Sequence, residues 1–207
     1  MVILYMTDRV KSQVVMFMVA LLLTLSLPTL AQSFSRREVS ETPYDIYLDS
    51  FRSVASRSPG AGPLAMASVQ EWLEKANDIR YNHIEAYRPR SPEEVEASGY
   101  GDCKDKALWL FAKLSAAGAH NVQLVIGKKD SQAEEFHAWL YLTLGDCIYL
   151  LDPTANESIC ETSDFGVDEY IPIYAYDHHG DYVYETAVTG LTSAVQDPTQ
   201  IPSVADP

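Results

Sequence analysis

The chain has 207 residues, of which 47% are hydrophobic and 11% aromatic. This is the composition of a folded domain, because 13 Tyr and 3 Trp supply more large apolar side chains than a disordered chain carries. Fifteen Lys and Arg stand against 29 Asp and Glu, which gives a formal charge of −14. Such a chain lacks the basic surface that neutralises phosphates, so we expect no nucleic-acid partner.

Residues 1–31 have the pattern of a secretory signal peptide. The basic residues Arg9 and Lys11 precede an uncharged, mostly apolar stretch, and we expect cleavage after Ala31. An uncleaved anchor helix is the alternative, although the strongly apolar part, Val14–Leu27, is short for a membrane span. The prediction is a periplasmic or secreted protein with no membrane span after signal cleavage.

Pattern and composition divide the rest of the chain into three segments. Residues 32–63 are polar and interrupted by Pro and Gly, and we predict an N-terminal arm with a short helix around 44–55 that packs on the domain. Residues 64–187 hold the regular elements and form the predicted main domain. Residues 188–207 lack aromatic side chains and are predicted to form a flexible C-terminal tail.

Helices come first in the main domain. Apolar residues at three- and four-residue steps predict a helix over 64–77. Ser91-Pro92-Glu93-Glu94 combines a capping box with Pro at the first helical position, so a short helix should run from there to Gly99. Asp102 is a good N-cap for a third helix that Gly118 would end. The buried stripe of that helix is Ala107, Leu110, Phe111 and Leu114.

The second half of the main domain alternates between apolar and polar residues, as half-buried strands do. Helices followed by antiparallel strands make an α+β fold. The predicted strands cover residues 122–126, 136–144, 148–151, 170–176 and 181–187.

Cys103 directly follows the predicted cap Asp102 and so lies in the first turn of a helix. Unpaired backbone N–H groups and the helix dipole stabilise a thiolate there, which is the setting of a nucleophilic cysteine. Two acidic and two basic neighbours roughly cancel, so a histidine would have to complete the activation. A buried structural thiol is the alternative interpretation.

A hairpin would bring a histidine and an aspartate to one face of the sheet. If Gly145-Asp146 is a two-residue turn, Trp139 lies opposite Asp152. His137 is two residues from Trp139, so its side chain leaves the same face as that of Asp152. An Asp that orients an imidazole beside a thiol makes a Cys-His-Asp site. Taken singly, a strand histidine and a turn aspartate would be unremarkable.

Several motifs together make the chain resemble the bacterial transglutaminase-like cysteine proteases of the papain-like superfamily, over roughly residues 64–185. The resemblance implies a transglutaminase-like or papain-like core, with N-terminal helices followed by an antiparallel sheet. The motifs are Ser91-Pro92-Glu93-Glu94, Gly99-Tyr100-Gly101-Asp102-Cys103-Lys104-Asp105-Lys106-Ala107, Leu114 with Gly118, His137-Ala138-Trp139 and Leu151-Asp152-Pro153-Thr154.

The same resemblance implies a Cys-His-Asp mechanism on a peptide or protein substrate. Cys103 would be the nucleophile, His137 the general base and acid, and Asp152 the residue that orients the imidazole. The acyl-enzyme formed on an amide would then be resolved by water in proteolysis or by an amine in transamidation. No metal or other cofactor is expected.

The sequence does not identify the second hydrogen-bond donor of the oxyanion hole. The backbone N–H of Cys103 is the natural first donor. Tyr81, Asn82 and Tyr100 are candidates for the second, although each is also explained as an ordinary packing or turn residue.

Further alternatives remain. Cys147 and Cys160 could form a disulfide in an oxidising compartment, which spacing alone does not decide. His178-His179 fits a polar hairpin turn better than a metal cluster. A non-catalytic module could hold a peptide or protein in the same cleft. A metal site made of Cys103, His137 and Asp152 is the least supported alternative, because no paired-ligand motif is present.

Overall fold

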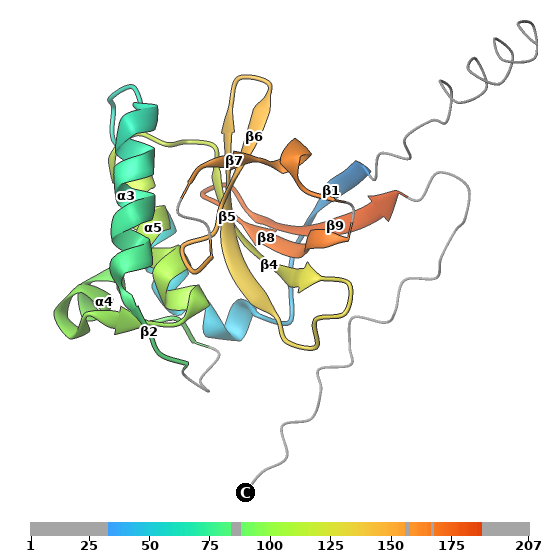
Figure 1. Ribbon diagram of the computed structural model, residues 1–207, viewed down its shortest axis with the longest axis horizontal. Helices are drawn as coiled ribbons and strands as arrows, with labels where there is room; N and C mark the ends of the chain where they lie inside the picture. The colour runs from blue at the N-terminus through green and yellow to red at the C-terminus, as the bar shows by residue number, and fades with distance from the viewer. Residues whose placement is uncertain (1–32, 84–87, 156–157, 167, 188–207) are drawn as a thin grey trace, which may run out of the picture. The chain divides into compact units, whose positions relative to one another are not determined.

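The computed structural model describes residues 33–83, 88–155, 158–166 and 168–187 (Figure 1). The predicted signal peptide, residues 1–31, and the predicted tail, residues 188–207, lie outside this part of the chain. Within it, every helix is too short or too polar to span a membrane.

A seven-stranded sheet with every neighbouring pair antiparallel organises the domain, in the order β1-β9-β8-β4-β5-β6-β7. A two-stranded parallel sheet pairs β2 (Arg80–Tyr81) with β3 (Tyr100–Gly101). The strands of the large sheet are β1 (Ser33–Val39), β4 (Val122–Asp130), β5 (His137–Leu144), β6 (Cys147–Leu151), β7 (Cys160–Glu161), β8 (Glu169–Tyr176) and β9 (Asp181–Ala187).

The helices follow the capping and periodicity signals closely. Ser91 and Glu94 make the predicted capping box, with the Ser91 N–H donating to Glu94 at 2.7 Å and the Glu94 N–H donating to Ser91 Oγ at 3.2 Å. Gly99 ends that helix with a left-handed φ of 68°. The helices are α2 (Asp49–Ala55), α3 (Met66–Asp78), α4 (Pro92–Ser98) and α5 (Cys103–Ala116), with 3-10 turns η1 (Asp45–Tyr47) and η2 (Thr162–Asp164).

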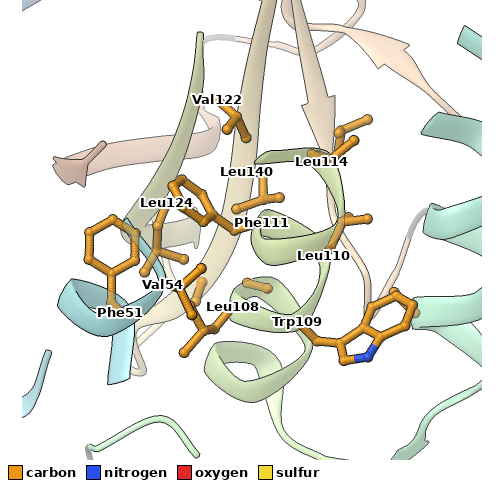
Figure 2. Packing of buried hydrophobic residues seen from close by; sticks show 14 of the residues in the cluster. Phe51, Val54, Leu108, Trp109, Leu110, Phe111, Leu114, Val122, Leu124 and Leu140 are labelled. Carbon is orange, nitrogen blue, oxygen red and sulfur yellow. The ribbon is translucent and has the colours of Figure 1, made fainter. Parts of the chain in front are cut away.

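Helix α5 is the centre of the main hydrophobic core. In Figure 2, Phe111 from α5 points toward Phe51 from α2 and Leu124 from β4, and the Phe51 and Phe111 rings lie 4.9 Å apart. The predicted stripe is buried, but Leu108 and Trp109 are buried too, because α3 and α4 also pack against α5. The helix is therefore enclosed on more sides than the stripe alone indicates.

The segment predicted as an arm is built into the sheet. Strand β1 pairs with β9 over its whole length. Its described side chains are largely exposed, so no alternation in the sequence marks it as a strand. Helix α2 follows at the expected place, and Arg52 holds it to β9 through two hydrogen bonds of 2.6 Å to Asp181.

The three cysteines are free in the structure. Cys160 pairs with Leu150, three residues along β6 from Cys147. At about 3.3 Å per strand residue this separates the two cysteines by roughly 10 Å along the strand, beyond the reach of a disulfide. The sequence left a Cys147–Cys160 disulfide open, and the structure does not form it.

His178 lies in the predicted hairpin turn, between β8 and β9. Its Nδ1 lies 2.8 Å from the carbonyl oxygen of Ala55, and its Nε2 lies 3.0 Å from Ser115 Oγ. These contacts tie the turn to α2 and α5. Across the described ranges, no three His, Cys, Asp or Glu side chains are grouped to hold a metal ion.

Candidate active site

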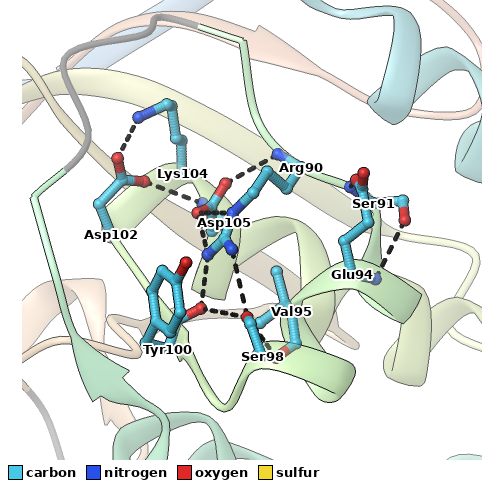
Figure 3. A network of polar contacts seen from close by, with 9 residues as sticks. All are labelled: Arg90, Ser91, Glu94, Val95, Ser98, Tyr100, Asp102, Lys104 and Asp105. Carbon is cyan, nitrogen blue, oxygen red and sulfur yellow. Dashed lines mark hydrogen bonds and ion pairs between the residues drawn. The ribbon is translucent and has the colours of Figure 1, made fainter.

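A buried polar network holds the N-terminus of α5 (Figure 3). Asp102 caps the helix by accepting from the Asp105 N–H at 3.3 Å, and it also pairs with Lys104. The fully buried Asp105 accepts from the Arg90 backbone N–H at 2.8 Å and from Arg90 Nε at 2.9 Å. Arg90 also donates to the Tyr100 carbonyl oxygen. These bonds fix the turn on which Cys103 lies.

A glycine lets this turn close. A Cβ at Gly101 would lie 2.9 Å from the Cβ of Asp105, a separation that real side chains do not show. Gly101 also accepts from the Asn82 N–H at 3.1 Å, which joins the loop after β2 to the start of α5. Cys103 follows as the first residue of α5 and is partly exposed.

The predicted hairpin register is confirmed. Leu144 pairs with Cys147 across the two-residue turn, in which Gly145 has φ 60°. His137 Nε2 consequently lies 2.9 Å from Asp152 Oδ2. The imidazole also stacks on Trp139, with ring centroids 6.1 Å apart and planes 25° apart.

Asp152 is fully buried and surrounded by hydrogen-bond donors. Oδ1 accepts from the backbone N–H and the hydroxyl of Thr154, at 2.8 and 2.7 Å. Oδ2 accepts from the Tyr170 hydroxyl at 2.9 Å, and Lys129 Nζ lies 3.9 Å away. Burial raises the pKa of Asp152, but the bonds from His137 and Thr154 outweigh it and lower the pKa to about 2. Asp152 is therefore a carboxylate that can fix an imidazole.

Tyr170 is a site residue that the sequence reasoning missed. It is buried, and its ring packs edge-on against Trp139 at 5.4 Å and Phe165 at 5.0 Å. Its φ of 48° lies in the left-handed region that bulky residues rarely adopt, a strain typical of functional positions. Nothing in the sequence distinguishes Tyr170 from the other 12 tyrosines. Thr154 could have been found, because in an Asp-Pro-Thr turn the N–H of the Thr is directed back to the Asp side chain.

The electrostatics connect His137 to Cys103. Burial lowers the pKa of His137, but its interactions with Asp152 and Cys103 outweigh that effect and raise the pKa to about 9. Burial and the charge of Cys103 raise the pKa of Tyr81. Because Nε2 of His137 faces Asp152, Nδ1 is the ring nitrogen left for the thiol.

Cys103 and His137 open into a cavity of about 640 Å³, a volume within the range of small-ligand and peptide subsites. Asp152 is not part of the lining and lies behind the imidazole. Much of the lining is apolar or aromatic, and it includes Tyr44, Tyr47, Leu48, Leu124, Ile126, Phe136 and Ala138.

The three oxyanion candidates lie in different places. Tyr81 lines the cavity and is about half exposed. Asn82 is exposed. The ring centroid of Tyr100 lies 4.7 Å from Cζ of Arg90. Neither residue is among those that line the cavity. Of the three candidates, Tyr81 is thus the one that lines the same cavity as Cys103.

Comparisons with known proteins identify the fold. No protein-family model matches the chain, and no curated protein matches it. The solved structure of LapG from Legionella pneumophila is 17% identical, with a TM-score of 0.50 over 68% of this chain and 77% of LapG. Calcium-bound LapG is 18% identical with a TM-score of 0.51 over the same shares, and EGTA-treated LapG is 17% identical with 0.51 over 68% and 75%. The α+β fold predicted from the sequence, with helices followed by an antiparallel sheet, is confirmed, and its likeness to LapG is consistent with the predicted transglutaminase-like core.

Proposed function

We propose that the protein is a cysteine hydrolase or acyltransferase that acts on peptide or glutamine amides through Cys103, His137 and Asp152. The observation that carries this proposal is the 2.9 Å bond between His137 and the buried Asp152, with the imidazole next to Cys103 in a cavity. Each residue has the neighbour that its role requires: a helix N-terminus for the thiol and a buried carboxylate for the imidazole.

In the first half-reaction the Cys103 thiolate attacks the amide carbonyl carbon. The carbon–sulfur bond forms, the carbon–nitrogen bond breaks, and the His137 imidazolium gives its proton to the leaving amine. In the second half-reaction His137 takes a proton from water, whose oxygen attacks the thioester and releases Cys103. If an amine replaces the water, the same steps give transamidation.

The tetrahedral intermediate needs donors for its oxyanion. The backbone N–H of Cys103 is one, at the start of α5, and we assign the second to the Tyr81 hydroxyl because Tyr81 lines the cavity. Asn82 and Tyr100 are dropped from this role because the cavity lining does not include them.

The setting of the activity follows from the sequence patterns. The signal-peptide pattern of residues 1–31 supports action in the periplasm or outside the cell. The acidic composition supports a peptide or protein substrate rather than a nucleic acid. The catalytic domain would comprise residues 64–187, joined by β1 and α2 from the preceding segment.

Alkylation of the purified chain tests the thiol chemistry. Iodoacetamide is applied at about pH 6, where an ordinary thiol is mostly protonated, and each cysteine is quantified by peptide mass spectrometry. Cys147 and Cys160 are internal controls, since both are free and partly exposed. We expect Cys103 to react at least about tenfold faster than the controls and to lose this advantage in His137→Ala.

Two results would contradict the proposal. Equal reactivity of the three cysteines, or a Cys103 rate that is unchanged in His137→Ala, would show that His137 does not activate the Cys103 thiol. Circular dichroism of the variant separates a lost imidazole from a lost fold. A cleft that binds peptides with the same affinity in Cys103→Ala, without any acyl-enzyme in the native chain, would then identify a non-catalytic binding module.

A further inference from the structure

We propose that the cavity beside Cys103 selects peptides with a large apolar side chain at the scissile amide and a positively charged group next to it. This inference rests on the proposed function and names its substrate class. It is carried by an apolar pocket that the fold holds open and by an acidic rim without cationic partners.

The apolar pocket has an exposed aromatic side chain immediately next to the catalytic histidine. Phe136, the residue before His137, is 39% exposed and lines the cavity. Its ring packs edge-on against Tyr44 at 5.8 Å, and Tyr44 packs against Tyr174 at 5.6 Å. Burying such apolar surface under a ligand side chain is favourable. An aromatic or branched aliphatic side chain of a bound peptide would therefore cover this apolar surface, whereas Ala or Gly would leave the surface in contact with water.

The pocket wall contributed by η1 is held in place before any ligand binds. The Thr42 N–H and hydroxyl donate to Asp45 at 2.9 and 2.7 Å, which closes the turn around Tyr44. The buried Thr42 hydroxyl also lies 2.7 Å from the Tyr176 hydroxyl of β8. The turn that carries Tyr44 and the neighbouring wall residues is therefore fixed to the sheet, and binding need not order it.

The rim of the same cavity is acidic. Three exposed acidic residues line the cavity: Asp130 at the end of β4, and Glu134 and Glu135 in the β4–β5 connection. None of the three has an ion pair with another described residue. Of the two lysines in the lining, Lys104 pairs with Asp102, and the half-exposed Lys129 lies 3.9 Å from Asp152, so the three carboxylates of the rim exceed the one lysine that is not closely paired. The rim therefore favours a Lys or Arg side chain, or a free amine, and disfavours acidic peptides.

Peptide vinyl sulfones test this selectivity, because they alkylate an active-site thiol without needing turnover. The probes are acetylated dipeptides that carry Lys and Phe in either order, with matched probes that replace Phe by Ala or Lys by Glu. The rate of Cys103 labelling is read by peptide mass spectrometry. For whichever order of Lys and Phe reacts faster, we expect the Phe probe to label Cys103 about tenfold or more faster than the Ala probe. We expect the Lys probe to label it several-fold faster than the Glu probe.

Two variants separate the parts of the pocket. Phe136→Ala should reduce the Phe-over-Ala ratio, and its control is Ile148→Ala, which removes an exposed apolar side chain outside the cavity. Glu135→Lys should reduce the Lys-over-Glu ratio, and its control is Glu74→Lys on the exposed surface of α3. Raising the salt from about 0.02 M to about 0.5 M should reduce the Lys preference and leave the Phe preference.

The result that overturns this inference differs from the one that overturns the proposed function. Labelling with no Phe or Lys preference, or preferences that the controls change as much as the cavity variants, overturns the substrate class alone. Failure of every probe to label Cys103 overturns it as well. In either case a fast, His137-dependent reaction of Cys103 with iodoacetamide leaves the proposed thiol chemistry standing.

Discussion

The Tyr170 hydroxyl and His137 Nε2 bind the same oxygen of Asp152, each at 2.9 Å. One carboxylate oxygen of Asp152 is thus hydrogen-bonded to both the phenol of Tyr170 and the imidazole of His137. A phenol that donates to a buried carboxylate stabilises its charge, which weakens its pull on the proton of the imidazolium. We infer that Tyr170 is a positioning residue that sets both the place and the basicity of His137 through Asp152.

Replacing Tyr170 with Phe removes this donor and keeps the ring packing. The buried oxygen loses a hydrogen bond to a charged group, so we expect a loss of about 1.5–3 kcal/mol in the free energy of unfolding. Asp152 then holds the imidazolium more strongly, and the pKa of His137 should rise above the value of about 9 in the native chain. Titration of His137 followed by NMR measures this shift.

The matched control is Tyr141→Phe, because Tyr141 is a buried phenol on the same sheet face with only a 3.5 Å contact to the Tyr170 carbonyl oxygen. It should leave the pKa of His137 unchanged. If both variants move the titration equally, or if neither does, Tyr170 has only a structural role.

The His137–Asp152 pair should make stability depend on pH in a predictable direction. The pKa of His137 is raised from 6.5 to about 9 by folding, so its stabilisation is complete below pH 6.5 and is lost as pH rises toward 9. The pKa of Asp152 is lowered from 3.8 to about 2, so its stabilisation is present above pH 3.8 and is lost as pH falls toward 2.

Urea unfolding of the native chain and His137→Gln at a series of pH values checks this dependence. The stability advantage of the native chain should shrink by up to about 3 kcal/mol between pH 6.5 and 9, the equivalent of the full pKa shift. An advantage that stays constant over this range would show that the imidazole is not held as a cation.

The sequence predicted most of the elements and the register that joins His137 to Asp152. The helix signals were local, as in the capping box of Ser91 and Glu94, and the hairpin depended on one two-residue turn at Gly145. Such features need no long-range information, since a cap or a tight turn is determined by neighbouring residues.

What the sequence did not predict depends on contacts between distant segments. Strand β1 is recognisable only from its pairing with β9, in which Ser33 lies opposite Ala187, more than 150 residues further along the chain. Tyr170 reaches Asp152 through a β8 backbone whose unusual φ no residue type indicates. The choice of Tyr81 over Tyr100 likewise required knowing which side chain the parallel pair of β2 and β3 leaves at the cavity.

Gly127 should tolerate no side chain, because it lies opposite His137 where β4 shifts register against β8. A Cβ there would lie 2.1 Å from the Ile171 carbonyl oxygen and 2.6 Å from the Trp139 ring on which His137 stacks. We expect Gly127→Ala to cost about 3 kcal/mol or more in the free energy of unfolding and to slow the labelling of Cys103.

Gly62→Ala is the control for this change, since nothing lies within 4 Å of its added Cβ. It should change the free energy of unfolding by less than about 0.5 kcal/mol. Thermal and urea unfolding measure both variants, and equal effects at the two positions would show that the close approach at Gly127 is unimportant.

Arg90 should be the basic residue on which the turn that carries Cys103 most depends. Arg90→Ala leaves the fully buried Asp105 without its guanidinium, and an unpaired buried charge costs about 3–5 kcal/mol. Because Asp105 also packs against Gly101, the turn that carries Cys103 should loosen, and the fast reaction of Cys103 with iodoacetamide should weaken.

The control for Arg90 is Arg57→Ala, because the pair that Arg57 forms with Glu93 at 3.3 Å is exposed on both sides. Removing an exposed pair costs about 1 kcal/mol or less. If both variants lose equally little stability and Cys103 stays reactive in both, the network around Asp105 does not hold the site. If Arg90→Ala alone loses both stability and the reactivity of Cys103, the burial of Asp105 explains the difference. Water does not reach this carboxylate and so cannot replace its lost partner.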